Sequence, residues 1–233
     1  MKKNFFKLFL IFFILGIFQS PLNAKNILQL NNIMIKDVFF NCDKILKYPN
    51  QIRCYNFTFK EPVAALYYIN KNVTKSIKKR LNFKEDKNIP KSFQNKLSCY
   101  VKSGFDRGHL ASDADFDYNL TILKTTYFTS NIVPETPYLN RRLIAEAEKT
   151  ERKFAVKLNG VYVLTGIIPS LQKLKKNKEC ANIPYLIYKI IISKQGKVIR
   201  IYIFKNRNMD NINTDVTKKL ILRKLGIIIK KVN

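Results

Sequence analysis

Short apolar segments bounded by turn-forming residues recur along this chain, and they limit the fold more than any other feature of the sequence. Strand-like segments of this kind cover residues 53–59, 63–69, 127–132, 161–168, 185–192 and 198–204. Lys60, Glu61 and Pro62 predict a turn between the first two segments, and residues 193–196 predict a hairpin between the last two. Because these strands do not alternate regularly with helices, the pattern predicts an α+β fold.

One helix is clear from the sequence. Pro134 and Pro137 are expected to hold the preceding loop extended, and Asn140 is the expected N-cap. Apolar residues then follow at positions i, i+4 and i+11, as one stripe on a helix requires: Leu143, Ala147 and Phe154. No internal repeat, Gly/Ser linker or break in composition divides residues 25–233, so we expect a single domain there.

The N-terminal residues are typical of a secretory signal peptide. Lysines precede an apolar run over residues 8–18, and a polar stretch then ends at Ala24, the expected last residue before cleavage. We therefore expect residues 1–24 to be a signal peptide, residues 25–233 to be the mature domain, and the protein to be periplasmic or secreted. An uncleaved membrane anchor is the alternative, but the run is shorter than the roughly 20 residues that span a bilayer. No second apolar stretch of that length follows, so stable membrane insertion of the mature chain is not expected.

Four cysteines follow this segment: Cys42, Cys54, Cys99 and Cys180. An even count in an exported chain favours disulfides, and four cysteines permit three pairings. Cys42 and Cys54 are close in sequence and flank the first strand, so we expect them to pair, which leaves Cys99 for Cys180. The spacings do not resemble a zinc site and the chain has one histidine, so zinc is not expected.

The charge of the chain indicates a polyanionic partner. Lysine and arginine number 43 against 16 aspartate and glutamate, which gives a formal net charge of +27. An AT-rich genome would enrich lysine, asparagine and isoleucine, but it would not remove acidic residues. A surface this positive repels itself unless it meets a polyanion, so nucleic acid or an anionic membrane is the expected partner class.

The only histidine, His109, ends the tetrapeptide Asp106-Arg107-Gly108-His109. Arg107 suits phosphate, Gly108 permits close backbone approach, and the Asp106 carboxylate is able to order the loop. A lone histidine is more often structural than catalytic. The neighbouring arginine in a strongly basic chain favours the catalytic interpretation, since an unperturbed histidine pKa of about 6.5 suits proton abstraction near neutral pH.

The expected helix carries a second candidate group. Four residues follow one another in i+4 steps and therefore lie along one flank of an α-helix: Asn140, Ile144, Glu148 and Arg152. One interpretation is an N-cap followed by a solvated Glu–Arg pair. The alternative is that this flank faces a cleft shared with the His109 loop.

Alternating polar side chains resemble the ligands of an EF-hand calcium loop: Asp113, Asp115, Asp117 and Asn119. The sixth position of that loop would be Tyr118 rather than glycine, and the twelfth is Lys124 rather than glutamate. We therefore expect a capped or solvated loop here rather than a calcium site.

The segment 103–111, Ser-Gly-Phe-Asp-Arg-Gly-His-Leu-Ala, resembles the signature of the DNA/RNA non-specific endonuclease family. The likeness continues through residues 130–134, 140–141, Glu148 and Arg152. Further similar positions lie upstream and downstream: Arg80, Phe83, Asp86, residues 89–90, 164–166, 183–184 and 188–189. Together these cover about residues 42–204. The family has the ββα-metal (His-Me finger) fold, so the resemblance implies a central antiparallel sheet flanked by helices.

The resemblance also implies a role for each site residue. His109 would activate the attacking water as general base, and Asn140 would be the only protein ligand of a Mg²⁺ ion, for which Mn²⁺ is an alternative. Glu148 would hold a metal-bound water. Arginines would bind phosphate and stabilise the charge that grows on it: Arg80, Arg107 and Arg152. The implied activity is metal-dependent hydrolysis of DNA and RNA without sequence preference.

Some positions depart from the family pattern. Ile144 stands where the family commonly has tryptophan, glycine is frequent near Arg142, and residues 209–233 match no part of the family. A non-catalytic cationic protein that binds nucleic acid on the same scaffold is the main alternative function. A membrane-active cationic protein is another, with residues 218–231 as its amphipathic helix. Preference between DNA and RNA, a homodimer and an inhibitor protein are left open.

Overall fold

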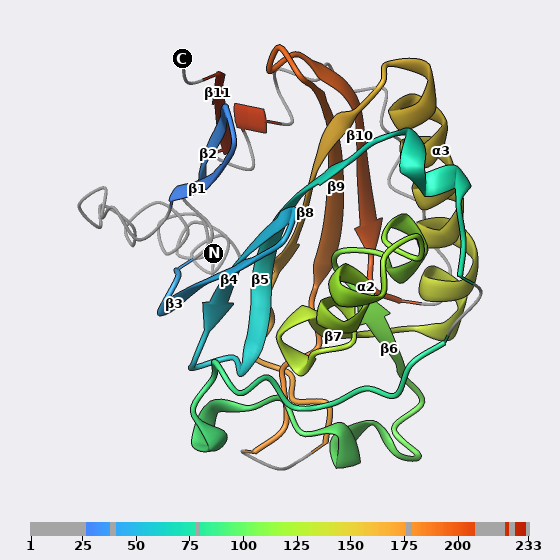
Figure 1. The fold of residues 1–233 in the computed structure, drawn as a ribbon. Helices are drawn as coiled ribbons and strands as arrows, with labels where there is room; N and C mark the ends of the chain where they lie inside the picture. The colour runs from blue at the N-terminus through green and yellow to red at the C-terminus, as the bar shows by residue number, and fades with distance from the viewer. Residues whose placement is uncertain are drawn as a thin grey trace, which may run out of the picture.

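A six-stranded antiparallel sheet forms the centre of the protein (Figure 1). The structure is a computed structural model, and it describes residues 27–37, 41–77, 80–175, 179–207, 222–223 and 227–231. The strands lie in the order β10-β9-β8-β5-β4-β3. Their bounds are β3 (Lys44–Tyr48), β4 (Gln51–Asn56), β5 (Glu61–Ile69), β8 (Val161–Ile168), β9 (Leu186–Ser193) and β10 (Val198–Lys205). The α+β fold with a central antiparallel sheet is confirmed.

The middle strands β5, β8 and β9 are buried along almost their whole length because both faces of the sheet are covered. Alternate side chains of a strand point to opposite faces. On one face, Thr165 of β8 lies 3.5 Å from the Tyr67 hydroxyl, which in turn donates to Glu151 of helix α3 (Ala145–Lys157). On the other face, the Tyr162 hydroxyl donates to Asn32, in the turn of a second, smaller sheet (2.9 Å).

The second sheet has three antiparallel strands in the order β1-β2-β11. They are β1 (Ile27–Leu30), β2 (Ile33–Asp37) and β11 (Ile227–Lys231), and β1 packs against β4 and β5. The membrane-active alternative would need an amphipathic helix over residues 218–231, but residues 227–231 form a strand. Apart from 222–223, the rest of that segment lies outside the described residues. Among the described residues, no helix is long and apolar enough to cross a membrane. The expected signal peptide, residues 1–24, also lies outside them.

A ββα unit lies on the α3 face of the main sheet (Figure 1). Strands β6 (Asp106–His109) and β7 (Ile132–Glu135) pair antiparallel, and the chain then enters a π-helical turn, η7 (Leu139–Ile144), that continues as α3 (Ala145–Lys157). Helix α2 (Leu120–Thr126) lies in the connection between the two strands. This unit is the arrangement that the resemblance implied.

The helix begins before Asn140, so the N-cap expectation is wrong. The Asn140 backbone N–H donates to the Thr136 carbonyl (3.0 Å), which places Asn140 inside the π-helical turn. Pro137 can start a helix because the first turn has no use for its missing N–H. The predicted apolar stripe is confirmed: Ala147 is buried, and Leu143 and Phe154 pack against the same core.

Residues 127–131, predicted as part of a strand, instead form a turn, an isolated bridge of Phe128 to Lys84 and the 3₁₀-helix η6 (Thr129–Asn131), and β7 begins only at Ile132. The Asn131 side chain accounts for the difference. Its Oδ1 accepts from the Ala111 N–H (3.0 Å), and its Nδ2 donates to the carbonyls of Ala111 and Thr126 (2.9 Å each). Such side-chain bonds to the backbone compete with a strand ladder. The other 3₁₀-helices are η2 (Lys71–Thr74), η3 (Lys91–Phe93), η4 (Leu97–Tyr100) and η5 (Asp113–Asp115).

The turn between β4 and β5 comes earlier than predicted. The Asn56 side chain accepts from the Phe59 N–H (2.9 Å) and ends β4, so the turn covers residues 57–60. Glu61 and Pro62, expected in the turn, belong to β5. The predicted hairpin between β9 and β10 is confirmed.

Both expected disulfides are present. Cys42 pairs with Cys54, twelve residues apart, and Cys99 pairs with Cys180, 81 residues apart. The second bond ties η4, which precedes β6, to the loop after β8. It therefore links the segment that leads into His109 to a distant part of the chain.

Candidate active site

Strand β6 presents the Asp-Arg-Gly-His tetrapeptide opposite β7, in the register Asp106–Glu135 to His109–Ile132. Gly108 is required by close packing: a Cβ there would lie 2.0 Å from Cδ of Glu135. The Glu135 side chain thus crosses the backbone between Arg107 and His109. It is fully buried, and neither of its oxygens has a hydrogen-bond partner among the described residues. Burial raises the pKa of Glu135 well above its usual value, and nearby Glu148 adds to the effect.

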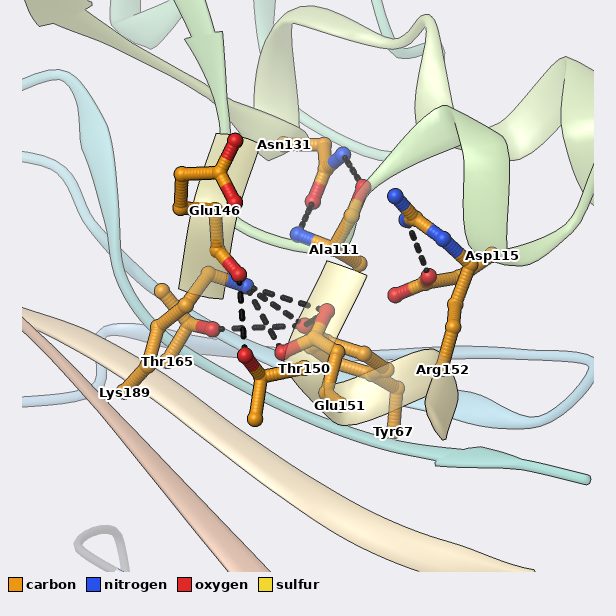
Figure 2. A network of polar contacts seen from close by, with 10 residues as sticks. All are labelled: Tyr67, Ala111, Asp115, Asn131, Glu146, Thr150, Glu151, Arg152, Thr165 and Lys189. Atoms are coloured by element: carbon orange, nitrogen blue, oxygen red, sulfur yellow. Dashed lines mark hydrogen bonds and ion pairs between the residues drawn. The ribbon is translucent and has the colours of Figure 1, made fainter. Parts of the chain in front are cut away.

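The segment just after His109 is held by Asn131, whose paired hydrogen bonds to Ala111 are drawn in Figure 2. Because both groups of the Asn131 amide are used, the connection between β6 and β7 is fixed next to the histidine. This gives a structural reason for the asparagine in the 130–134 segment.

A cavity of about 950 Å³ lies over the ββα unit and collects most of the candidate residues. Its lining includes five of the six predicted site residues: Arg80, Arg107, His109, Asn140 and Glu148. They come from the loop after β5, from β6, from η7 and from α3. The interpretation in which the helix flank faces a cleft shared with the His109 loop is therefore the one that the structure supports.

His109 lies half-buried between aromatic rings, with ring centroids 5.3 Å from those of Phe83 and of Tyr127. Its Nε2 is covered and has no hydrogen-bond partner in the described part of the chain. Burial lowers the pKa of His109 below its usual value, although the Asp113 carboxylate raises it. Asp113 is itself oriented by the Tyr127 hydroxyl, which donates to its Oδ2 (2.6 Å).

Asn140 is oriented by Asp106. Its Nδ2 donates to the Asp106 Oδ2 (3.0 Å), so the amide Oδ1 is left as an acceptor without a partner among the described residues. Arg141 holds the same carboxylate through two bonds of 2.8 Å, and these bonds and that of Asn140 keep the pKa of Asp106 below its usual value. The sequence indicated that Asp106 orders a loop; it did not indicate Arg141 as its partner. A π-helical turn at such a position is typical of functional sites.

Glu148 lines the cavity one turn of α3 before a buried ionic network. Burial raises the pKa of Glu148 to about 7, against the opposing charge of Lys189. The Lys189 Nζ donates to the Tyr67 hydroxyl (2.8 Å) and to both oxygens of Glu151 (3.3 Å each), as Figure 2 shows. The side chains of Lys189 and Glu151 are both 0% exposed. This network is not predicted by the sequence patterns above, although a lysine within an apolar strand is a signal of one, since buried charges are almost always paired.

Arg152 does not line the cavity with the other predicted residues. Its Nη1 donates to Oδ1 of the fully buried Asp115 (2.9 Å), and Figure 2 shows this bond. Arg152 follows Glu148 by four residues on α3, and its positive charge lowers the Glu148 pKa.

The alternating acidic residues do not converge on one point. Asp113 accepts from Tyr127, Asp115 from Arg152, and Asp117 from Ser76. Asn119 caps helix α2 by accepting from the backbone N–H groups of residues 121 and 122 (3.0 and 3.1 Å). The capped loop expected here in place of a calcium site agrees with these bonds.

Comparison with known proteins agrees with this geometry. The profile of the DNA/RNA non-specific endonuclease family matches residues 31–224. Mitochondrial nuclease of Saccharomyces cerevisiae is 34% identical over 119 residues, which are 49% of this chain and 36% of that protein. Human mitochondrial endonuclease G is 27% identical over 146 residues (57% of this chain, 49% of that protein). A nuclease of Syncephalastrum racemosum is 29% identical over 166 residues (70% and 51%).

The chain thus spans only about a third to a half of the length of these relatives. Among solved structures, EndoG in a crystal structure of the EndoG/EndoGI complex has the same fold. The TM-score is 0.67 at 21% identity, over 79% of this chain and 84% of that one. Because the family profile covers most of the chain and the fold agrees, this protein belongs to the DNA/RNA non-specific endonuclease family.

Proposed function

We propose that this protein is a metal-dependent endonuclease that hydrolyses phosphodiester bonds in DNA and RNA without sequence preference. The observation that carries the proposal is the shared cavity, in which an imidazole, an amide, a carboxylate and two guanidinium groups converge from four separate segments. A +27 chain attracts nucleic acid through its phosphates, which carry no sequence information.

His109 serves as the general base in this proposal. The lowered pKa of its imidazole keeps the ring neutral near pH 7, so it is able to accept a proton from water. Covered by Phe83 and Tyr127 and with the Asp113 carboxylate nearby, the ring is held in place while the imidazolium that forms has a countercharge.

Arg80 and Arg107 bind the phosphate, since both line the cavity beside the histidine. Guanidinium groups match phosphate oxygens and stabilise the charge that grows on them in the transition state. Arg152 stays bound to Asp115, and its positive charge lowers the pKa of Glu148.

The residues fit a hydrated magnesium ion, with manganese as an alternative. Asn140 would hold it through the Oδ1 that its bond to Asp106 leaves free, and Glu148 would accept from a water of its hydration shell. Oxygen ligands and retained waters are what Mg²⁺ prefers. When bound, such an ion stabilises the leaving oxygen and polarises the phosphate.

The test is incubation of purified mature protein with plasmid, linear DNA and RNA, with and without EDTA. We expect degradation of all three, without discrete sequence-defined fragments, and loss of cleavage in EDTA that added Mg²⁺ restores. Cleavage that EDTA does not affect, or cleavage at a defined sequence, contradicts the mechanism. Tight binding without any cleavage supports the non-catalytic alternative.

We also propose that the protein is exported, to the periplasm or the medium. The signal-like residues 1–24 and the two disulfides support this, because disulfides persist in oxidising compartments. Mass spectrometry of protein recovered from its natural compartment is expected to give an N-terminus at Lys25 and two intact disulfides. Full-length protein with four thiols in the cytoplasm would overturn the proposal.

A further inference from the structure

Phe83 contacts two of the proposed site residues at once. It lines the cavity, and its ring centroid lies 5.3 Å from that of His109, with 37° between the ring planes. The guanidinium carbon of Arg107 lies 5.4 Å from the centre of the same ring. A third neighbour, Tyr127, has its ring 5.1 Å away. The Phe83 ring therefore contacts both the His109 imidazole and the Arg107 guanidinium.

The backbone around Phe83 is fixed. The Lys84 N–H donates to the Tyr127 carbonyl (3.1 Å), and the Lys84 carbonyl accepts from the Thr129 N–H (2.9 Å). Three residues after Phe83, the buried Asp86 carboxylate accepts from the hydroxyls of Tyr48 and Ser130. Since the chain directly after Phe83 is tied at both Lys84 and Asp86, the backbone that carries the ring is held without a bound substrate.

We propose that Phe83 is a positioning residue, which shields the His109 imidazole from water and holds the Arg107 guanidinium beside it. This inference rests on the proposed function. The main alternative is that Phe83 is a platform on which a nucleobase stacks. Its contacts to three side chains favour the positioning role, because they occupy ring surface that a base would need.

The charged groups around His109 are of both signs. Asp113 favours the protonated imidazole, while Arg53, Arg80 and Lys189 disfavour it, and burial is the largest effect and lowers the His109 pKa. Without the Phe83 ring, water reaches the imidazole and the penalty of burial falls. The charged form is then easier to reach, so less of the base is neutral at a given pH.

The single histidine of the chain makes a direct test available. Untagged, metal-free protein is titrated while the histidine ring signals are followed by NMR. We expect the His109 pKa to rise in Phe83→Ala toward the ordinary value of about 6.5, with Phe83→Leu between the two. Phe93→Ala is the matched control: Phe93 stacks on Phe57 at 4.4 Å, is 36% exposed, and lies outside the cavity lining. Its substitution is expected to leave the histidine titration unchanged.

Cleavage kinetics give the second readout. In Phe83→Leu the acidic limb of kcat/KM against pH, which reports the free enzyme as the NMR titration does, is expected to move upward by the same amount. KM is expected to rise because Arg107 is less well held. An unchanged His109 titration in folded Phe83→Ala or Phe83→Leu overturns the inference. So does a rise in KM alone, which supports base stacking. Because the titration needs no activity, a parent protein that fails to cut nucleic acid refutes the proposed function separately.

Discussion

At the scale of single residues, burial at the cavity favours the neutral form of two groups of opposite charge type, an imidazole and a carboxyl. Burial lowers the pKa of His109 and raises that of Glu148 to about 7. Each shift has the same cause, since loss of water disfavours the charged form of either group. Asp106 differs, because Arg141 and Asn140 keep it charged.

The first prediction concerns Asp106, which orients the proposed metal-binding amide. Asp106→Asn removes the charged acceptor of Asn140 and Arg141, so we expect Mn²⁺ affinity to fall about 10–100-fold, as is typical when a group that orients a ligand is lost. Titration calorimetry with Mn²⁺ measures the change. Arg141→Ala is the control: it keeps the bond between Asp106 and Asn140 and is expected to weaken binding less. Parent-like affinity in Asp106→Asn contradicts the orienting role.

A second prediction concerns Glu135, a buried carboxyl whose folded-state pKa is raised. Below its ordinary pKa the group is protonated in both states, so it adds no pH-dependent term to the stability. As pH rises above about 4.5 toward the folded-state pKa, the unfolded state loses its proton first and the fold loses stability. Glu135→Gln should therefore be more stable than the parent at pH 7 and similar at pH 4, as measured by urea unfolding. The exposed Glu146→Gln serves as control and should show no such gain. A variant that is less stable than the parent at pH 7 refutes this account.

At the scale of elements, the sequence predicted what apolar patterning determines and missed what single polar side chains determine. Strand β8 was predicted at its observed bounds, and the β9–β10 hairpin within a residue or so. The strand over 127–132 was wrong because the Asn131 amide bonds to two other segments, a contact no local pattern reveals. The N-cap at Asn140 was wrong because the helix starts earlier and makes a π-helical turn.

The third prediction concerns the buried ion pair of Lys189 and Glu151, which links α3 to the main sheet. Lys189→Met leaves Glu151 buried without its cation, and breaking a buried pair in this way typically costs about 3–5 kcal/mol of unfolding free energy. The double variant Lys189→Met/Glu151→Leu removes both charges and should recover most of that loss. Urea unfolding compares them. The exposed pair on the same helix provides the control: Lys149→Ala/Glu146→Ala should change the unfolding free energy far less than Lys189→Met does, because solvent screens an exposed pair. If Lys189→Met is as stable as the parent, the buried ion pair is not needed for stability.

At the scale of the whole molecule, the site required both the sequence and the fold. The resemblance supplied six residues, and the fold brings five of them to one cavity; Arg152 is separated because Asp115, 37 residues away in sequence, binds it. The contacts of Lys189 and Glu135 near the site could not be predicted from sequence spacing alone, because their neighbours come from other strands and helices. Both disulfides were predicted from position and elimination.

The net charge leads to a fourth prediction, on binding. Each phosphate neutralised on duplex DNA contributes a slope of about −0.9 to log K against log salt. We expect a steep linear decrease in the affinity of His109→Ala protein for a short duplex between low and physiological salt, measured by fluorescence anisotropy. Arg80→Ala should make the slope less steep by about 0.9, the contribution of one phosphate contact. A nearly flat dependence is incompatible with binding through phosphates.

The central claim is that His109 is the general base and the arginines bind the phosphate, so that catalysis and nucleic-acid binding can be separated by mutation. The most direct measurement compares plasmid cleavage and DNA affinity in the parent and in His109→Ala, each with Mg²⁺. The account predicts that cleavage falls about 10²–10⁴-fold, as loss of a general base typically gives, while affinity stays within about threefold. Cleavage at the parent rate in His109→Ala would contradict it.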